Sequence, residues 1–190
     1  ACHELELNIG KTKQSKNLGI VGAGPAGLAS AITAAERGHK VTLFEAKDKI
    51  GGQFNLAREI PGKEEFDETL RYYKRQLDRL GVYVQLDTRV TITQLNNSDF
   101  DEIILATGVV PRVPVIEGID HPTVVNYTDV INGVIEIGER VAIIGAGGIG
   151  FDVAEFLSHS GHPTSLNIPA FMQEWGIDMD LQARGGIEGV

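Results

Sequence analysis

The fold is decided by a short stretch near the start of the chain, Leu18–Gly27, which reads LGIVGAGPAG. Its first residues, Leu18 to Ala23, form a short apolar run that ends in glycine, which is typical of a buried β-strand. Small and apolar residues at helical spacing follow from Pro25 to Arg37, and Gly38 then ends that helix. A second apolar run, Val41–Phe44, predicts the next strand. Together these segments predict a βαβ unit, the first unit of a parallel sheet.

The glycines of this stretch stand where such a unit binds a pyrophosphate. Gly22 permits the tight turn out of the strand, and Gly24 lets the backbone approach phosphates because it has no Cβ. Gly27 allows the helix to pack close to the strand, and Pro25 suits the first helical position. The N–H groups of the first turn, where Ala26 lies, then face the phosphates along the helix dipole. The alternative is a glycine-rich turn that binds no ligand.

Glu45 supports the binding interpretation. It closes the second predicted strand, 23 residues after Gly22. A carboxylate at that place accepts hydrogen bonds from both ribose hydroxyls of an adenosine. It would repel a 2′-phosphate, so we expect this first site not to hold NADP.

A second stretch, Gly145–Gly150 (GAGGIG), repeats the pattern 123 residues after the first. It follows an apolar run, Val141–Ile144, that predicts a strand, and Gly148–Ser158 reads as the next helix. The residues expected to bind a nucleotide here are Gly145, Gly147, Gly148, Ile149 and Gly150. The pattern breaks down beyond Gly161, so the residue that would choose between NAD and NADP is not recognisable. The repeat predicts an α/β chain with two related nucleotide-binding domains, the second one incomplete.

Between the two motifs, periodicity predicts one helix and three strands. The helix spans Glu64–Leu80 and carries one apolar stripe, formed by Phe66, Leu70, Tyr73, Leu77 and Leu80. The strands are expected at Val82–Leu86, Arg89–Ile92 and Glu102–Ala106. The expected organisation is a linker arm at 1–17, a first nucleotide-binding domain at 18–112, a crossover at 113–137, and the N-terminal part of a second domain at 138–190.

Further candidate binding residues lie between the motifs. Gly51-Gly52-Gln53 follows Glu45 closely, and its glycines permit backbone approach while the Gln53 amide can donate and accept. Thr107-Gly108 closes a strand where a cofactor could pass. Arg58 and Lys63 are the nearest cations that could neutralise a pyrophosphate. The alternative for Gly51-Gly52-Gln53 is a surface turn, and that for Thr107-Gly108 is a simple strand-end turn. The alternative for Arg58 and Lys63 is that they are solvated surface cations.

Composition excludes several other functions. A net charge of −9 disfavours nucleic acid as a partner. No apolar run is long enough to span a bilayer, and no secretory signal is visible. Cys2 is the only cysteine, so the chain has no disulfide and no iron–sulfur cluster of its own, and a reducing cytoplasm is expected. The motif Cys2-His3-Glu4 reads as linker, so no metal site is expected. No Ser-His-Asp set or carboxylate pair is recognisable, so no catalytic side chain is predicted.

Three longer stretches carry a resemblance to a known family. They are Gly51–Asn55 (GGQFN), Ile60–Phe66 (IPGKEEF) and Glu174–Asp178 (EWGID). With the two glycine motifs, they resemble the bacterial NADPH-dependent 2,4-dienoyl-CoA reductases, and the resemblance covers essentially the whole chain. It implies a Rossmann-like FAD-binding domain followed by an incomplete Rossmann-like NAD(P)-binding domain. In that family an FMN barrel and a four-cysteine iron–sulfur segment come first, and electrons pass from NADPH to FAD, through the cluster to FMN, and on to the dienoyl-CoA.

The resemblance also implies roles for individual residues. Glu45 would hold the FAD ribose, and Ala26 with its flanking glycines would contact the pyrophosphate. Gln53 and Lys63 would face the FAD phosphates or ribityl chain, and the backbone of Val90 would meet the adenine edge. The cofactor would pass Ala106, Thr107 and Gly108, whereas Gly145 to Gly150 would lie under the NADPH pyrophosphate.

The chain departs from the family's pattern by lacking the barrel, the cluster cysteines and a closing FAD segment. It is therefore expected to be an electron-entry module that works with the remaining domains of a parent chain. Two alternatives stay open: a domain that keeps only ADP, as in trimethylamine dehydrogenase-like proteins, and a non-catalytic nucleotide-binding or assembly module.

Overall fold

The computed structural model describes residues 3, 6, 10–159, 161 and 163–187. Cys2 and much of the predicted arm lie outside the described residues. The chain forms two compact units. Unit 1 comprises Ala1–Asn55 and Asp67–Ile119, and unit 2 comprises Leu56–Phe66 and Asp120–Val190. Residues 56–66, which the sequence places within the first domain, therefore belong to unit 2.

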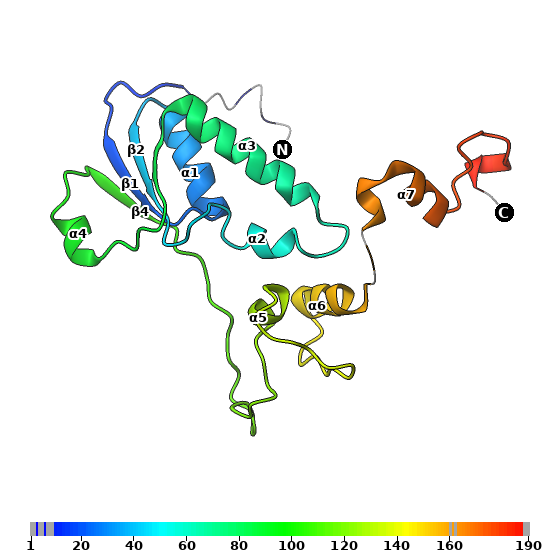
Figure 1. The fold of residues 1–190 in the computed structure, drawn as a ribbon. Coiled ribbons are helices and arrows are strands. Elements are labelled where there is room, and N and C mark those ends of the chain that lie inside the picture. The colour runs from blue at the N-terminus through cyan, green and yellow to red at the C-terminus, as the bar shows by residue number, and fades with distance from the viewer. Residues whose placement is uncertain (1–2, 4–5, 7–9, 160, 162, 188–190) are drawn as a thin grey trace. The chain divides into compact units, whose positions relative to one another are not determined.

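Unit 1 is an α/β domain built on a four-stranded parallel sheet (Figure 1). The strands lie in the order β3-β2-β1-β4. Along the chain the elements of this unit are β1 (Asn17–Val21), α1 (Pro25–Glu36), β2 (Lys40–Phe44), α3 (Glu65–Leu80), β3 (Tyr83–Gln85), α4 (Ile92–Asn96) and β4 (Glu102–Leu105), with α2 (Phe54–Ala57) at the boundary between the units. The predicted parallel α/β fold is confirmed.

The core of unit 1 lies between the sheet and the helices α1 and α3. Ile20 of β1 pairs in register with Leu43 of β2 and Ile104 of β4. Ile20, Leu28 and Leu43 are the largest side chains that are fully buried. Helix α3 adds Leu77, which is buried, with Tyr73 and Leu80 packed against the same cluster. The apolar stripe predicted for α3 therefore faces the core over its last two turns.

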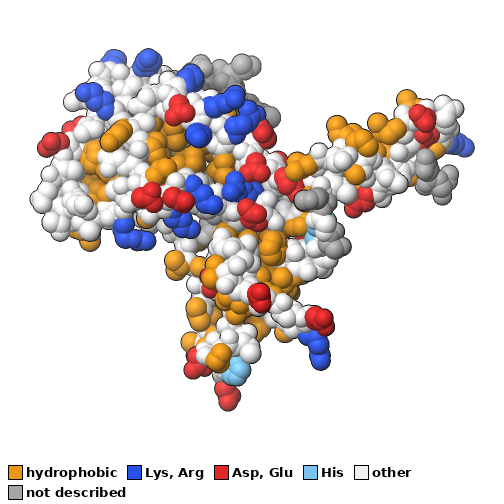
Figure 2. All heavy atoms as spheres, in the orientation of Figure 1, with side chains coloured by type: hydrophobic (Ala, Val, Ile, Leu, Met, Phe, Trp, Pro, Cys, Tyr) orange, Lys and Arg blue, Asp and Glu red, His pale blue; other side chains and the backbone are white. Residues whose placement is uncertain are grey.

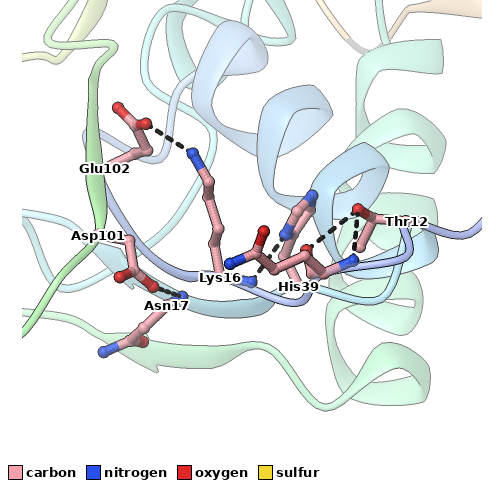
Figure 3. A network of polar contacts seen from close by, with 7 residues as sticks. Thr12, Lys16, Asn17, His39, Asp101 and Glu102 are labelled. Atoms are coloured by element: carbon pink, nitrogen blue, oxygen red, sulfur yellow. Dashed lines mark hydrogen bonds and ion pairs between the residues drawn. The ribbon is translucent and has the colours of Figure 1, made fainter.

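The end of the predicted arm is tied to unit 1 by polar contacts at the amino ends of the strands (Figure 3). The N–H of Thr12 donates to the carbonyl of Arg37 at 2.7 Å. The N–H of Lys16 donates to Nδ1 of His39 at 3.1 Å, and its ammonium pairs with Glu102 at 2.7 Å. The N–H of Asn17 donates to the Asp101 carboxylate at 2.7 Å. Residues 12–17 therefore fix the start of β1 against the α1–β2 connection and the start of β4.

Unit 2 contains α5 (Tyr127–Ile131), α6 (Gly148–Ser158), η1 (Thr164–Leu166), α7 (Ile168–Glu174) and η2 (Arg184–Gly186). Its small core consists of Ile60, Ile131 and Val153, with Leu56, Tyr127, Phe156 and Leu157 packed around them. The predicted helix α6 is confirmed. Ile177 and Ile187 form an isolated antiparallel bridge.

Two predicted strands are wrong. Val141–Ile144 has no strand conformation, and Val141, Ile143 and Ile144 are 40–71% exposed. A strand needs a hydrogen-bonded neighbour, and none of the described segments pairs with this run. Instead of a strand at Arg89–Ile92, residues 89–91 form a loop that leads into α4, because Thr91 and Gln94 form a reciprocal capping box that starts a helix at Ile92.

The C-terminal part of unit 2 buries little apolar surface. Leu166, Ile168, Trp175, Met179 and Leu181 are 62–81% exposed. Figure 2 shows hydrophobic side chains on the visible surface around α7. One charged residue of this part is buried: the Asp178 carboxylate accepts the backbone N–H groups of Asp180, at 2.9 Å, and of Ala183. Among the described residues, no helix has the length and apolar character needed to cross a membrane.

Candidate functional site

The first glycine motif forms a tight turn from β1 into α1. Gly22 has φ +103°, and a Cβ on it would lie 2.3 Å from the carbonyl oxygen of Ala106. A Cβ on Gly27 would lie 1.8 Å from the carbonyl oxygen of Gly22. These two glycines are therefore required for the close packing of strand and helix, as the sequence predicts.

Gly24 differs from Gly22 and Gly27, because neither its backbone conformation nor its packing requires glycine. It is the N-cap of α1, with φ −75° and ψ 179°, which any residue can adopt. A Cβ on it would meet nothing closer than the Cα of Gly52, at 3.9 Å. Pro25 follows as the first residue of α1, and Ala26 is exposed beside it. The absence of a side chain at Gly24 thus leaves open space at the N-terminus of α1, which is the cradle that a phosphate needs.

A second pair of glycines lies against this turn. The N–H of Gly51 donates to the carbonyl of Ala23 at 2.8 Å. Gly51 and Gly52 have φ +119° and +52°, and a Cβ on Gly52 would lie 2.9 Å from the Cα of Gly24. Gln53, next to them, is exposed. The structure therefore brings the sequence-predicted Gly51-Gly52 turn directly onto the glycine motif.

Glu45 lies at the carboxyl end of β2, next to the same turn. One carboxylate oxygen accepts the N–H of Ala23 at 2.8 Å, and the other accepts the N–H of Lys47 at 3.0 Å. The side chain is half-buried. Both oxygens keep further lone pairs, so the carboxylate can fix the turn and still accept hydroxyl donors.

The remaining predicted residues of unit 1 lie around this centre. The N–H of Ala106 donates to the carbonyl of Val21 at 2.8 Å, and a Cβ on Gly22 would lie 3.2 Å from the Cα of Thr107. Gly108 is exposed with φ +77°. The N–H of Thr88 donates to the Glu45 carbonyl at 2.8 Å, which brings the loop that contains Val90 to the end of β2.

The second glycine motif, in unit 2, repeats the local geometry of the first. Gly145 has φ +120°, and a Cβ on Gly150 would lie 2.2 Å from its carbonyl oxygen. Gly147 is the N-cap of α6 with φ −89° and ψ −178°, and Gly148 is the first helical residue. A Cβ on Gly147 would meet nothing within 4 Å. Ile149, on the first turn, is 54% exposed. The two motifs therefore share a structural glycine pair and an open N-cap.

Lys63 has a partner that sequence spacing does not reveal. Its ammonium lies 2.6 Å from the carboxylate of Asp152 on α6, 89 residues away in the chain. The neighbouring Glu64 accepts the hydroxyl of Ser165 at 2.7 Å and the N–H of Gly62 at 3.0 Å. Burial disfavours ionisation of Glu64, but these hydrogen bonds, its own N–H and the charge of His159 together hold its pKa below the usual value. Both charged groups are thus engaged within unit 2.

The described residues hold no group of three or more His, Cys, Asp or Glu side chains arranged to bind a metal ion. The site consists instead of backbone groups, glycines and one carboxylate. That chemistry suits a nucleotide diphosphate, since backbone N–H groups can bind phosphate and a carboxylate can bind ribose.

Residues 16–172 match the family model of the pyridine nucleotide-disulphide oxidoreductases. Among curated proteins, the chain is 35% identical over 168 residues to a metal reductase of Desulforamulus reducens, covering 85% of this chain and 25% of that protein. It is 34% identical over 173 residues to an NADH oxidase of Thermoanaerobacter brockii, and the match covers 89% of this chain and 26% of that protein. The chain thus spans about a quarter of the length of these curated relatives.

Two solved structures resemble the chain. One is a 2-naphthoyl-CoA reductase in complex with 2-naphthoyl-CoA, with a TM-score of 0.77 and 34% identity, covering 87% of this chain and 27% of that one. The other is histamine dehydrogenase from Rhizobium sp. 4-9, with a TM-score of 0.58 and 26% identity. That match covers 68% of this chain and 21% of the dehydrogenase chain. Together with the family match over most of its length, these similarities show that the chain belongs to the pyridine nucleotide-disulphide oxidoreductase family of oxidoreductases.

Proposed function

We propose that the chain is the electron-entry module of an NADPH-dependent 2,4-dienoyl-CoA reductase-like flavoenzyme. In this proposal the motif in unit 1 binds FAD and the motif in unit 2 binds NAD(P)H. The observation that carries it is the repeated geometry, in which Gly22 and Gly145 form positive-φ turns while Gly24 and Gly147 leave open N-caps. The similarity to the 2-naphthoyl-CoA reductase supports a role in the reduction of an unsaturated acyl-CoA.

The residues of unit 1 fit the ADP half of FAD. The N–H groups of the first turn of α1 would receive the pyrophosphate above Gly24, beside Ala26. Glu45 would accept the ribose hydroxyls while its bond to Ala23 holds the turn in place. Gly52 and Gln53 would border the phosphates, and Ala106 to Gly108 would line the path of the cofactor. Val90 would offer its backbone to the adenine.

Glu45 also favours FAD over NADP in this first site, because a carboxylate repels a 2′-phosphate. Hydride transfer from a nicotinamide to a flavin is chemistry that the two bound cofactors supply. The protein's own residues bind and orient the dinucleotides. The FMN, the iron–sulfur cluster and the acyl-CoA site belong to other domains in this proposal.

Titration of the purified chain with FAD, followed by flavin fluorescence, tests the first site. FAD binding at 1:1 stoichiometry is the expected result. Binding of ADP with rejection of FAD would instead favour the ADP-keeping alternative. If neither ligand binds, the nucleotide-site proposal for unit 1 is wrong. NADPH titration in the presence of saturating FAD tests the second site in the same way.

A further inference from the structure

We infer that Lys63 is a positioning residue for the second dinucleotide site, because its ammonium neutralises the Asp152 carboxylate beside the phosphate-binding end of α6. This inference rests on the proposed function of the second glycine motif. It gives Lys63 a role toward the nucleotide of unit 2, in place of the FAD phosphates of unit 1.

The turn Ile60-Pro61-Gly62-Lys63 fixes the backbone position of Lys63. The N–H of Lys63 donates to the carbonyl of Ile60 at 3.0 Å, and Gly62 has φ +82°. Proline followed by a positive-φ glycine is the signature of a type II turn. Ile60 is 3% exposed and belongs to the same core cluster as Val153 of α6. The turn is therefore anchored in unit 2 by a buried side chain at its first position.

The Lys63–Asp152 ion pair joins this turn to α6. Asp152 precedes Val153 on α6, and its carboxylate lies 2.6 Å from the Lys63 ammonium. The two side chains are 38% and 34% exposed. Because Ile60 and Val153 belong to the same buried cluster, both backbones are held in the core of unit 2 and the pair needs little further ordering. Its position is thus determined by the core of unit 2.

Asp152 stands close to the end of α6 where a phosphate would bind. It is the fifth residue of the helix that begins at Gly148. Four steps of helical rise place it about 6 Å along the axis from that residue. Helical side chains lean toward the N-terminus, so its carboxylate leans toward Gly147 and Gly148. This separation is within the Debye length of about 10 Å at 0.1 M salt, so an unpaired carboxylate there would repel a bound pyrophosphate.

Lys63 removes that repulsion. The paired ammonium and carboxylate carry no net charge, so Asp152 adds no uncompensated negative charge near the open N-cap at Gly147. Glu64, the adjacent carboxylate, is held by Ser165 and the N–H of Gly62. The arrangement therefore uses one cation to cancel one specific anion on α6, rather than to contact the nucleotide itself.

A set of charge variants of the full chain tests the inference, with NADPH as the probe and nicotinamide fluorescence as the readout. We expect Lys63→Met to weaken NADPH binding about five- to tenfold at about 0.05 M salt, and the loss to shrink at about 0.5 M salt. Lys63→Arg keeps the charge and should bind like wild type. Lys63→Met combined with Asp152→Asn should restore binding, because the repelling carboxylate is gone.

Controls separate charge from packing. Lys74→Met removes an exposed lysine of α3 in unit 1 and should leave NADPH binding unchanged. Thermal unfolding of every variant reports any loss of fold. If Lys63→Met binds like wild type, or if the double variant stays as weak as Lys63→Met, the inference is wrong while the proposed function stands. If the wild-type chain itself rejects NADPH, the proposed role of the second motif fails and this inference fails with it.

Discussion

The Glu45 carboxylate accepts the backbone N–H of Ala23 at 2.8 Å, inside the turn between Gly22 and Gly24. This bond joins the acidic residue at the end of β2 to the glycine turn at the end of β1. The turn is also held by the N–H of Gly51, which donates to the carbonyl of Ala23 at 2.8 Å. Both backbone groups of Ala23 are thus satisfied, so the turn is preorganised by Glu45 and Gly51 before any nucleotide arrives.

Glu45→Ala should lower FAD affinity by about 10- to 100-fold, which corresponds to about 1.5–3 kcal/mol for a charged hydrogen-bonding partner. It should also lower the melting temperature, because the N–H groups of Ala23 and Lys47 lose their acceptor. Glu45→Gln is the matched variant, since its single amide oxygen can serve only one of these two N–H groups. FAD titration and thermal unfolding measure both effects. Equal FAD affinities in wild type and Glu45→Ala would contradict the assignment.

Gly24 and Gly27 should respond in opposite ways to the same substitution. Gly27→Ala places a Cβ 1.8 Å from the carbonyl oxygen of Gly22, so it should destabilise unit 1 by about 3 kcal/mol or more. Gly24→Ala meets no atom closer than 3.9 Å, so it should keep the melting temperature of wild type. Its methyl group would fill the phosphate cradle, and we expect at least about tenfold weaker FAD binding, about 1.4 kcal/mol. Unfolding scans and FAD titrations of both variants check this. A stable Gly24→Ala chain with full FAD affinity would show that phosphates do not approach this turn.

The same contrast can be made in unit 2. Gly150→Ala places a Cβ 2.2 Å from the carbonyl oxygen of Gly145, and we expect it to lower the stability of unit 2. Gly147→Ala has open space within 4 Å and an ordinary φ of −89°, so it should fold normally and bind NADPH more weakly. Gly138→Ala, also with open space, is the control for the loss of a glycine in this unit. Circular dichroism and NADPH titration are the two measurements. Normal stability of Gly150→Ala would argue against the close approach of α6 to the Gly145 turn.

Local sequence signals predicted the parts of the fold that depend on neighbours along the chain. The strand, glycine turn and helix from Asn17 to Glu36 follow from adjacent residues, and so does the helix Gly148–Ser158. The strand predicted at Arg89–Ile92 from its alternation is wrong, because Thr91 and Gln94 form a capping box that starts a helix at Ile92. A capping box is a specific local signal of a helix start, and it is stronger than a four-residue alternation.

Other features depend on partners far away in the chain. Val141–Ile144 has the composition of a buried strand, but strand formation requires a pairing neighbour, which no local pattern reveals. Lys63 and Asp152 are 89 residues apart, and neither residue type indicates the other. The same holds for the contact between Gly52 and Gly24, since the sequence shows two glycine turns without showing that they touch. Tertiary contacts of this kind can be read only from the structure.

The loop that follows α7 should unfold on acidification because of Asp178. The N–H of Ala183 is the main cause that lowers the pKa of this carboxyl, burial opposes it, and the N–H groups of Asp180, Gln182 and Leu181 add to the lowering. A group whose pKa is lower in the folded state stabilises the fold above its unfolded pKa, near 3.8, and loses that contribution as pH falls through the folded value. Unit 2 should therefore be stable at neutral pH and lose stability below about pH 4.

Trp175 is the only tryptophan of the chain and lies three residues before Asp178, with its ring 5.9 Å from that of Phe171. Its fluorescence thus reports this loop selectively. We expect the emission to change as the wild-type chain is titrated below about pH 4, because the loop buries few apolar groups and opens at low cost. Asp178→Asn should already show the altered emission at neutral pH and should flatten the acid response. Asp180→Asn, an exposed neighbour, should titrate like wild type. If Asp178→Asn keeps the wild-type acid transition, the ionised carboxylate is not what holds the loop, and the backbone hydrogen bonds it accepts contribute nothing to the pH dependence of unit 2.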